Sequence, residues 1–191
     1  AVDNLVIDMP NTTVYVNGVI LHLTAATAEN TLVLNEGTEI TNLVIKGGNV
    51  EILSGASIVS IERAADNTDE VTYVYYHNAA DIADVVIGEG IVTVLTINDL
   101  ASLKAFRDAV NAGNTYAGQT VKLGADIDLG GEQWDAIGTE ENNFKGTFDG
   151  NGHKISNIYQ NTWEMFGDYN DGYSGTPNHY KDAMGLFGYV L

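Results

Sequence analysis

The chain has 191 residues and a formal net charge of −18, with eight lysines and arginines in all. So few cations argue against binding to phosphate backbones or to anionic membrane surfaces, and we predict no nucleic-acid partner. No apolar run is long enough to cross a bilayer, and the first residues do not begin like a signal peptide, so we expect no membrane insertion. The absence of cysteine excludes disulfides, thiolate metal sites and thiol nucleophiles.

From residue 4 to about residue 95, short β-branched runs alternate with turn dipeptides such as Asn-Gly and Gly-Gly. Such runs are typical of strands, and the dipeptides between them are typical of tight turns. We therefore predict strands over residues 5–7, 13–16, 19–23, 32–34, 43–45, 50–53 and 58–61.

Residues 63–70 interrupt this rhythm and are expected to form an exposed acidic loop. The next run, 71–76, is a predicted strand with Tyr73 and Tyr75 on one face and Tyr76 on the other, because strand side chains alternate. Cross-strand packing is the simplest role for these tyrosines.

Part of this region repeats at one fixed offset. The matched positions are residues 4–7 with 42–45, Asn11 with Asn49, and Ile20 and Leu23 with Ile58 and Ile61; a second echo relates 32–37 to 85–90. Stacked coils need matching apolar positions, so the repeat favours a parallel β-solenoid. An antiparallel sandwich of seven or more strands is the alternative.

Residues 96–113 form the one predicted helix. Thr96 and Asp99 match a capping box, an apolar stripe with Leu103 and Val110 follows, and Gly113 serves as the stop. We expect the helix to cover the open end of the stacked strands, where unpaired backbone would invite association. The predicted division is a β-rich repeat region over 1–95 and a helix-plus-coil region over 96–191.

The later part of the chain carries a recognisable set of motifs. These are Ala-Asp-Ile-Asp-Leu in 121–129, Ile-Gly in 134–138, Gly-Thr-Phe-Asp-Gly-Asn-Gly-His in 144–158, and Gly-Leu-Phe-Gly in 185–188. Residues 144–158 are predicted to form a strand, a tight turn at 149–152 with positive φ at Gly150 and Gly152, and a second strand.

Together with the predicted helix, these motifs resemble the start of bacterial surface proteins that carry GLUG motifs. That family is predicted to form right-handed parallel β-helices of the pectin-lyase-like type. The resemblance covers about 96–191 and implies secretion or cell-surface display, adhesion and contact with carbohydrate or host glycoprotein. It departs from the family at an aromatic insertion, 160–184, and further coils of the same array are expected beyond residue 191.

Two groups of residues are candidates for chemistry. Asp126 and Asp128 lie on one side of a predicted strand, near Asp149; they could serve a polysaccharide lyase or hydrolase, or simply face solvent opposite Ile127 and Leu129. The four histidines, at 22, 77, 153 and 179, show no metal-ligand spacing.

The aromatic insertion is the predicted binding site. Its rings lie among acidic and amide side chains, a composition that suits sugar stacking. The ligand-binding candidates are Trp163, Tyr169, Tyr173 and Tyr180, and the metal candidates are Asp168 and Asp171. We predict no cofactor, with calcium at the two aspartates as the alternative.

The sequence thus predicts a mostly-β protein of right-handed parallel β-helix coils with one capping α-helix. Its predicted function is a non-catalytic, adhesin-like binding or scaffold module outside the cell. The alternatives are a polysaccharide lyase or glycoside hydrolase on the same fold, and a purely structural stalk segment.

Overall fold

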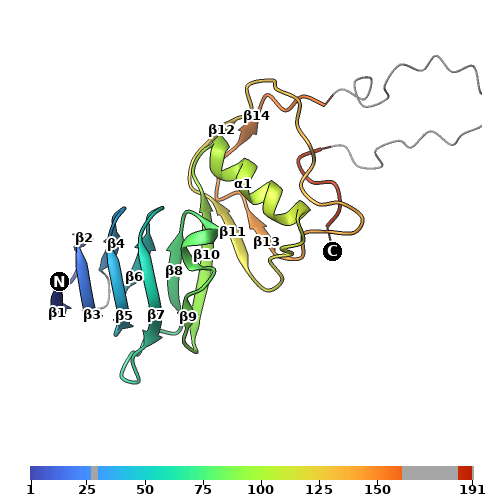
Figure 1. Ribbon diagram of the computed structural model, residues 1–191. Helices are drawn as coiled ribbons and strands as arrows, with labels where there is room; N and C mark the ends of the chain where they lie inside the picture. Colours follow the sequence, from blue (N-terminus) through green and yellow to red (C-terminus); the bar gives the residue numbers. More distant parts are fainter. Residues whose placement is uncertain (27–29, 161–184, 191) are drawn as a thin grey trace, which may run out of the picture. The chain divides into compact units, whose positions relative to one another are not determined.

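The computed structural model describes residues 1–26, 30–160 and 185–190 and is mostly β, with one α-helix in the described part. The chain divides into two compact units (Figure 1). The first unit comprises Ala1–Ile97 with Gln119–Lys122, and the second comprises Asn98–Gly118 with Leu123–Leu191. Within the described residues, no helix is both long and apolar enough to span a membrane.

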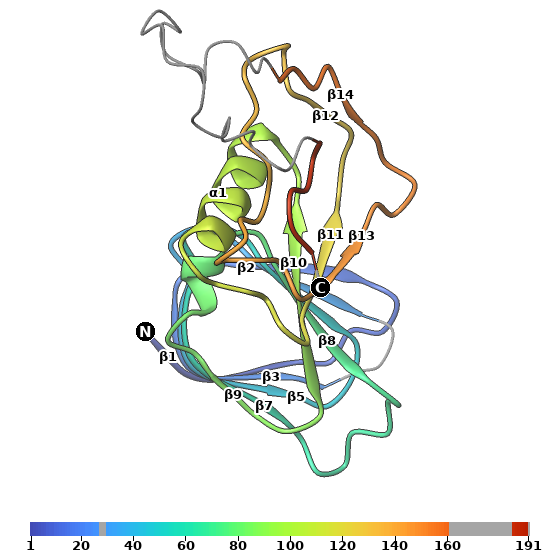
Figure 2. The ribbon, with the colours of Figure 1, turned by 90° about the vertical axis from the view of Figure 1, so that its right-hand side faces the viewer.

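In the first unit, successive strands alternate between two sheets. Sheet A has the order β1 (Val2–Ile7), β3 (Val19–Ala25), β5 (Glu39–Ile45), β7 (Ser57–Arg63) and β9 (Val86–Ile87). Within this unit, sheet B has the order β2 (Thr13–Val16), β4 (Thr31–Leu34), β6 (Asn49–Ile52), β8 (Thr72–Tyr76), β10 (Ile91–Ile97) and β11 (Thr120–Leu123). A 3₁₀ turn, η1 (Ala79–Ile82), lies between β8 and β9. Figure 2 shows β1, β3, β5 and β7 lying one behind another.

Every pairing from β1 to β10 is parallel. The alternative of an antiparallel sandwich is therefore wrong. All seven strands predicted before residue 62 form, and their bounds differ from the predicted ones by at most a few residues. The short β-branched runs are long enough for one strand each, and the positive-φ glycines between them, such as Gly18 and Gly37, turn the chain into the next sheet.

The register explains the sequence repeat. Leu5 of β1 lies opposite Leu23 of β3, which lies opposite Leu43 of β5, so residues 4–7 and 42–45 occupy equivalent places two strands apart in sheet A. Leu23 and Leu43 are fully buried. This part of the repeat, and the match of Ile20 and Leu23 with Ile58 and Ile61, is confirmed by the register.

Two other parts of the predicted repeat are wrong. Asn49 lies opposite Thr31, which in turn lies opposite Thr13, so Asn11 is not its equivalent. The echo between 32–37 and 85–90 joins β4 of sheet B to β9 of sheet A. Similar turn residues produced this echo, because the same Glu-Gly turn chemistry serves corners that lead into different sheets.

The predicted acidic loop after β7 is less exposed than expected. Asn67 is buried, and its Nδ2 donates to the carbonyl of Ile45 and to Thr72 Oγ1, both at 3.1 Å. Arg63 Nε also donates to Thr72 Oγ1 at 3.1 Å. The buried amide of Asn67 attaches the loop to neighbouring residues. The acidic composition of the loop predicted exposure and gave no sign of this contact.

In the second unit, α1 (Leu100–Asn111) packs on an aromatic cluster. The Phe106 ring lies 5.1 Å from that of Tyr116 and 5.4 Å from that of Phe144, in edge-to-face contacts. Phe148 and Phe187 extend the cluster, with ring centroids 5.1 Å apart. The predicted apolar stripe is confirmed, since Leu103, Phe106 and Val110 are buried.

The predicted helix start is wrong by one turn. Thr96 belongs to β10, and the N-cap is Asp99, whose side chain accepts from Ser102 N at 2.7 Å. Asp99 N donates to Ser102 Oγ at 3.1 Å, which completes the capping box. Residues 91–95 of β10 pair with β8, and the strand continues through Thr96. Thr96 therefore does not cap the helix. Gly113, with φ of 110°, follows the helix as predicted.

The motif at 144–158 forms two strands and a turn, although the strands are not partners in a hairpin. β14 (Ile155–Ser156) pairs in parallel with β12 (Ile127–Asp128), while β13 (Thr147–Asp149) precedes the turn. Positive φ occurs at Asn151 and Gly152, so the prediction is confirmed at Gly152 and wrong at Gly150.

Candidate functional site

A shallow hollow of about 590 Å³ lies on the second unit where β12 and β14 end. It is lined by Asp128, Gly130, Gly131, Asn157, Ile158 and Tyr159. We name this feature the β12–β14 hollow. All its residues belong to two short segments that follow paired strands.

Parallel pairing brings these segments together. Asp128 lies opposite Ser156, and beyond the strands Gly131 N donates to the carbonyl of Asn157 at 3.0 Å. Gly130, Gly131 and Asn157 have positive φ, which bends both segments out of the strand direction. A Cβ at either glycine would meet open space, so the glycines supply conformation and leave the hollow unobstructed.

The Asp128 carboxylate is the polar centre of the hollow. Its Oδ1 accepts from Gly130 N and from Asn157 Nδ2, both at 2.8 Å. These bonds hold the pKa of Asp128 below its usual value, the Gly130 bond having the larger effect, so the side chain is ionised at neutral pH. Among the described residues Oδ2 has no hydrogen-bond partner and is available as an acceptor.

Two side chains give the hollow an apolar component. Ile158 is 43% exposed and Tyr159 is 46% exposed. The Tyr159 hydroxyl makes no hydrogen bond within the described part of the chain. An exposed ring beside a carboxylate acceptor can stack on an apolar ligand face while the acceptor receives a hydroxyl proton.

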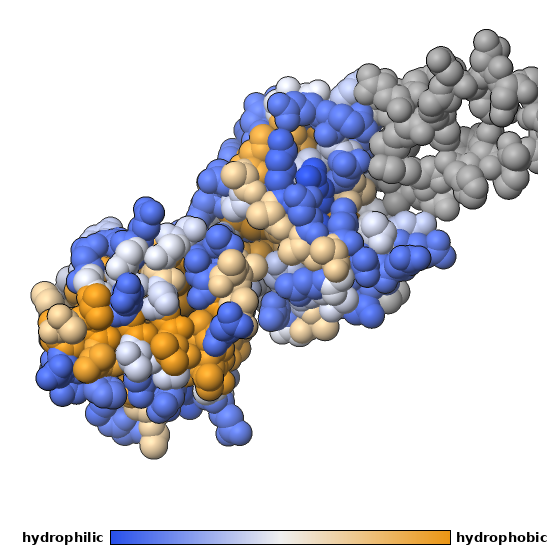
Figure 3. Space-filling model, in the orientation of Figure 1, coloured by the Kyte–Doolittle hydropathy of each residue, from blue (hydrophilic) through white to orange (hydrophobic). Residues whose placement is uncertain are grey.

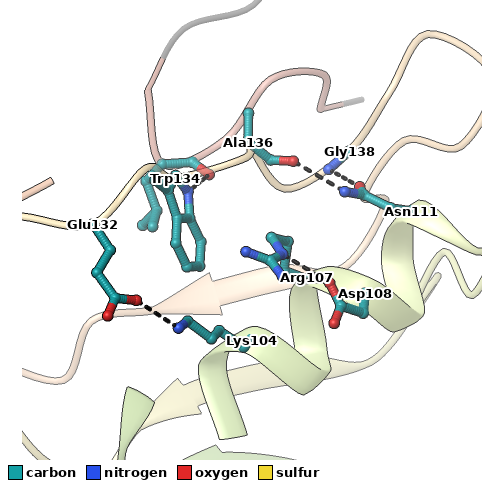
Figure 4. Close-up of polar contacts among 9 residues, drawn as sticks. Lys104, Arg107, Asp108, Asn111, Glu132, Trp134, Ala136 and Gly138 are labelled. Atoms are coloured by element: carbon teal, nitrogen blue, oxygen red, sulfur yellow. Dashed lines mark hydrogen bonds and ion pairs between the residues drawn. The ribbon is translucent and has the colours of Figure 1, made fainter. Parts of the chain in front are cut away.

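Helix α1 supports the segment that runs out of the hollow (Figure 4). Lys104 Nζ contacts Glu132 Oε2 at 3.0 Å, and the Arg107 guanidinium lies 4.9 Å from the centre of the Trp134 ring. Asn111 Oδ1 accepts from Gly138 N at 2.7 Å. The three side chains lie on one face of the helix because they are three and four residues apart. They contact residues in 132–138, the segment that directly follows the Gly130–Gly131 bend.

Asp126, the other predicted carboxylate, lies outside the hollow. It is exposed with Asp128, opposite the buried Ile127 and Leu129, as the alternation predicts. Its Oδ1 accepts from Lys154 N at 3.2 Å and contacts His153 Nδ1 at 3.3 Å. The Lys154 bond is the main cause of a lowered pKa at Asp126.

These carboxylates have the wrong pKa direction for a general acid, which needs a raised value. Asp149, the third predicted member, uses Oδ1 to accept from Asn151 N at 2.8 Å within its turn. No group of three histidine, cysteine or acidic side chains suited to a metal ion occurs in residues 1–26, 30–160 and 185–190.

The predicted insertion site lies outside the described residues. This applies to Trp163, Tyr169, Tyr173 and Tyr180 and to the metal candidates Asp168 and Asp171. The residues on either side of that segment are bonded to each other. Gln160 Nε2 donates to the carbonyl of Gly185 at 3.0 Å, and Gln160 Oε1 accepts from Gly185 N at 2.6 Å. Gln160 directly follows Tyr159, which lines the hollow.

Sequence reasoning found Asp128 and missed the residues that meet it. Asn157 lies in, and Tyr159 directly follows, the second predicted strand of the 144–158 motif, for which the sequence indicated no partner; the structure pairs it with 127–128. The Gly130–Gly131 pair directly after a strand was an available signal for a bend. Comparison of the chain with protein-family models, with curated proteins and with solved structures gives no match.

Proposed function

We propose that the protein is a carbohydrate-binding module of an extracellular, adhesin-like kind, built on coils of a right-handed parallel β-helix. The β12–β14 hollow carries this proposal. It combines one ionised carboxylate with a free acceptor oxygen, one exposed tyrosine ring and an open glycine bend, which together suit a sugar with hydroxyls and an apolar ring face.

The β-helix part of the proposal is supported by the first unit. Strands alternate between two parallel sheets in chain order, and equivalent leucines stack at the same register position. The resemblance to GLUG-motif surface proteins agrees with this arrangement and supplies the expectation of surface display, adhesion and a glycoprotein partner.

The charge of the chain limits the class of sugar that can bind. A net charge of −18 and a carboxylate at the centre of the hollow disfavour acidic sugars, because like charges repel across a partly desolvated contact. We therefore expect neutral glycans, or the neutral parts of a host glycoprotein, to bind in the hollow.

The test is a glycan array probed with the purified chain and with Tyr159→Ala. We expect selective binding of neutral glycans, reduced about tenfold or more by Tyr159→Ala, because stacking on the ring is lost. Asp126→Asn is the matched control, since it changes a nearby exposed carboxylate outside the hollow. No neutral glycan binding, or equal binding by Tyr159→Ala, would contradict the proposal.

A second variant separates the hollow from the predicted insertion site. Residues 161–184 are replaced by a short Gly-Ser linker, which the direct bonds between Gln160 and Gly185 make geometrically feasible. We expect this variant to keep its glycan binding. Binding that disappears in the linker variant and persists in Tyr159→Ala would assign the ligand to the insertion. Runs with calcium and with a chelator test the metal alternative.

A further inference from the structure

The outer side of sheet B in the first unit carries a row of aromatic and polar side chains. Tyr15, Val33, Glu51 and Tyr75 lie opposite one another across β2, β4, β6 and β8. Tyr73 stands two residues before Tyr75 on the same side of β8. We name this surface the tyrosine face. It belongs to the first unit and shares no residue with the β12–β14 hollow.

Rings dominate the exposed part of this face. Tyr15 is 65% exposed and Tyr73 is 39% exposed, whereas Val33 is only 4% exposed. Tyr73 and Tyr75 stack on each other, with ring centroids 6.1 Å apart and planes 23° apart. This contact confirms their placement on one face, and the Tyr73 side chain keeps part of its surface exposed.

The tyrosine face carries one acidic side chain, which contacts a histidine. Glu51 Oε1 lies 2.8 Å from His77 Nε2, and the register places no lysine or arginine among the side chains on this face. Asn35 Nδ2 donates to Asn17 Oδ1 at 3.1 Å at the edge of the face, which adds a neutral amide pair. A surface of rings, amides and one carboxylate is suited to an uncharged, hydroxyl-rich ligand.

Sheet A shows what a protein-binding surface would present instead. Its exposed side chains include Val6, Val59 and Val86, each more than half exposed, and Figure 3 shows hydrophobic residues gathered on one side of this unit. The row from Tyr15 to Tyr75 has no aliphatic side chain exposed to that extent, and Val92, which lies opposite Tyr73 on β10, is 39% exposed. The difference favours sugar over protein as the ligand of the tyrosine face.

We infer that the tyrosine face binds a linear, uncharged polysaccharide that runs across the strands. Neighbouring strands are about 4.8 Å apart, so Tyr15 and Tyr75 are separated by roughly 14 Å, a span of a few pyranose rings. Tyr15 and Tyr73 stack on rings at the two ends of the span. Asn49 and Glu51 lie between them and accept from or donate to the hydroxyls.

The experiment is affinity electrophoresis in gels containing a neutral polysaccharide (galactomannan, xyloglucan or mixed-linkage β-glucan) or polygalacturonate. All variants are made in the Tyr159→Ala chain, so that the hollow does not contribute. We expect retardation by at least one neutral polymer and none by polygalacturonate. Tyr15→Ala and Tyr73→Ala should each raise the dissociation constant about tenfold or more.

Three controls keep the result specific. Tyr15→Phe should bind normally, because it keeps the ring, and Val59→Ala should bind normally, because it alters sheet A. Circular dichroism melting confirms that each variant is folded. The inference is overturned by the absence of retardation in every neutral gel, by equal retardation of the parent and both alanine variants, or by a preference for polygalacturonate. Because these variants are made in the Tyr159→Ala chain, the result does not depend on whether the β12–β14 hollow binds glycans.

Discussion

The two units of the chain hold their backbones in different ways. In the first unit, strands of up to seven residues form continuous parallel ladders around aliphatic side chains. In the second unit, β12, β13 and β14 have two or three residues each, and the backbone is held by side chains: an aromatic cluster around Phe106 and amide groups such as Asn111 and Gln160.

The difference teaches where single residues matter. A ladder distributes its free energy over many similar bonds, so one exposed side chain contributes little to it. An amide that satisfies two backbone groups at once has no substitute when it is removed. The first unit has such an amide in Asn67, and the second unit, where the hollow lies, has Asn111 and Gln160.

The largest expected loss of stability comes from a substitution in the aromatic cluster. Phe106→Ala removes the ring that contacts Tyr116, Phe144 and Phe148, and we expect it to lower the free energy of unfolding by about 3–5 kcal/mol. Phe106→Leu keeps most of the volume and should cost less than half as much. Chemical denaturation measures both, and a loss below about 1 kcal/mol for the alanine variant would show that the cluster is not the core of this unit.

A smaller effect is expected for amide contacts, and its size should depend on how many backbone groups the amide bonds. Asn111→Ala leaves Gly138 N without its acceptor and the Ala136 carbonyl without its donor, at a cost of about 1–3 kcal/mol. The matched change in the first unit is Asn17→Ala, which breaks an exposed amide pair and should cost under about 0.5 kcal/mol. Equal losses in the same denaturation experiment would contradict the larger cost of removing an amide that bonds two backbone groups.

The smallest expected effects are on the pH dependence of stability, and Asp128 and Asp81 should contribute to it with opposite signs. The pKa of Asp128 is lowered by its bonds to Gly130 and Asn157, so its contribution to stability is present above its usual value of 3.8 and is lost as pH falls through the lower folded value. The pKa of Asp81 is raised by burial, so its contribution is present below 3.8 and is lost as pH rises through the higher folded value.

Denaturation at pH values from 6 to about 2.5 tests these signs. Relative to the parent chain, Asp128→Asn should become more stable as the pH falls, because the parent loses the benefit of its carboxylate. Asp81→Asn should have its greatest relative stability near pH 6 and lose that advantage on acidification. Parallel curves for the parent and both variants would contradict both assignments.

The sequence predicted the strands of the first unit well, because each short β-branched run ends at a turn residue and the repeat fixes equivalent positions such as Leu5 and Leu43. It predicted the buried stripe of α1 for the same local reason. It misplaced the helix cap, because Thr96 belongs to β10, whose residues 91–95 pair with β8. It missed most of the hollow, since contact between Asp128 and Asn157 depends on a parallel register across 28 residues of chain that no local pattern encodes.

The register of sheet A also bears on how the chain finds its native order of strands. The similar sequences at 4–7 and 42–45 are separated by β3, whose His22 and Thr24 differ from both. A repeat with identical neighbours could pair a strand with the wrong copy and become trapped during folding. Because the side chains of β3 differ from those of β1 and β5, wrong strand pairings differ in free energy from the native pairing. The differences between copies of the repeat therefore disfavour misfolding.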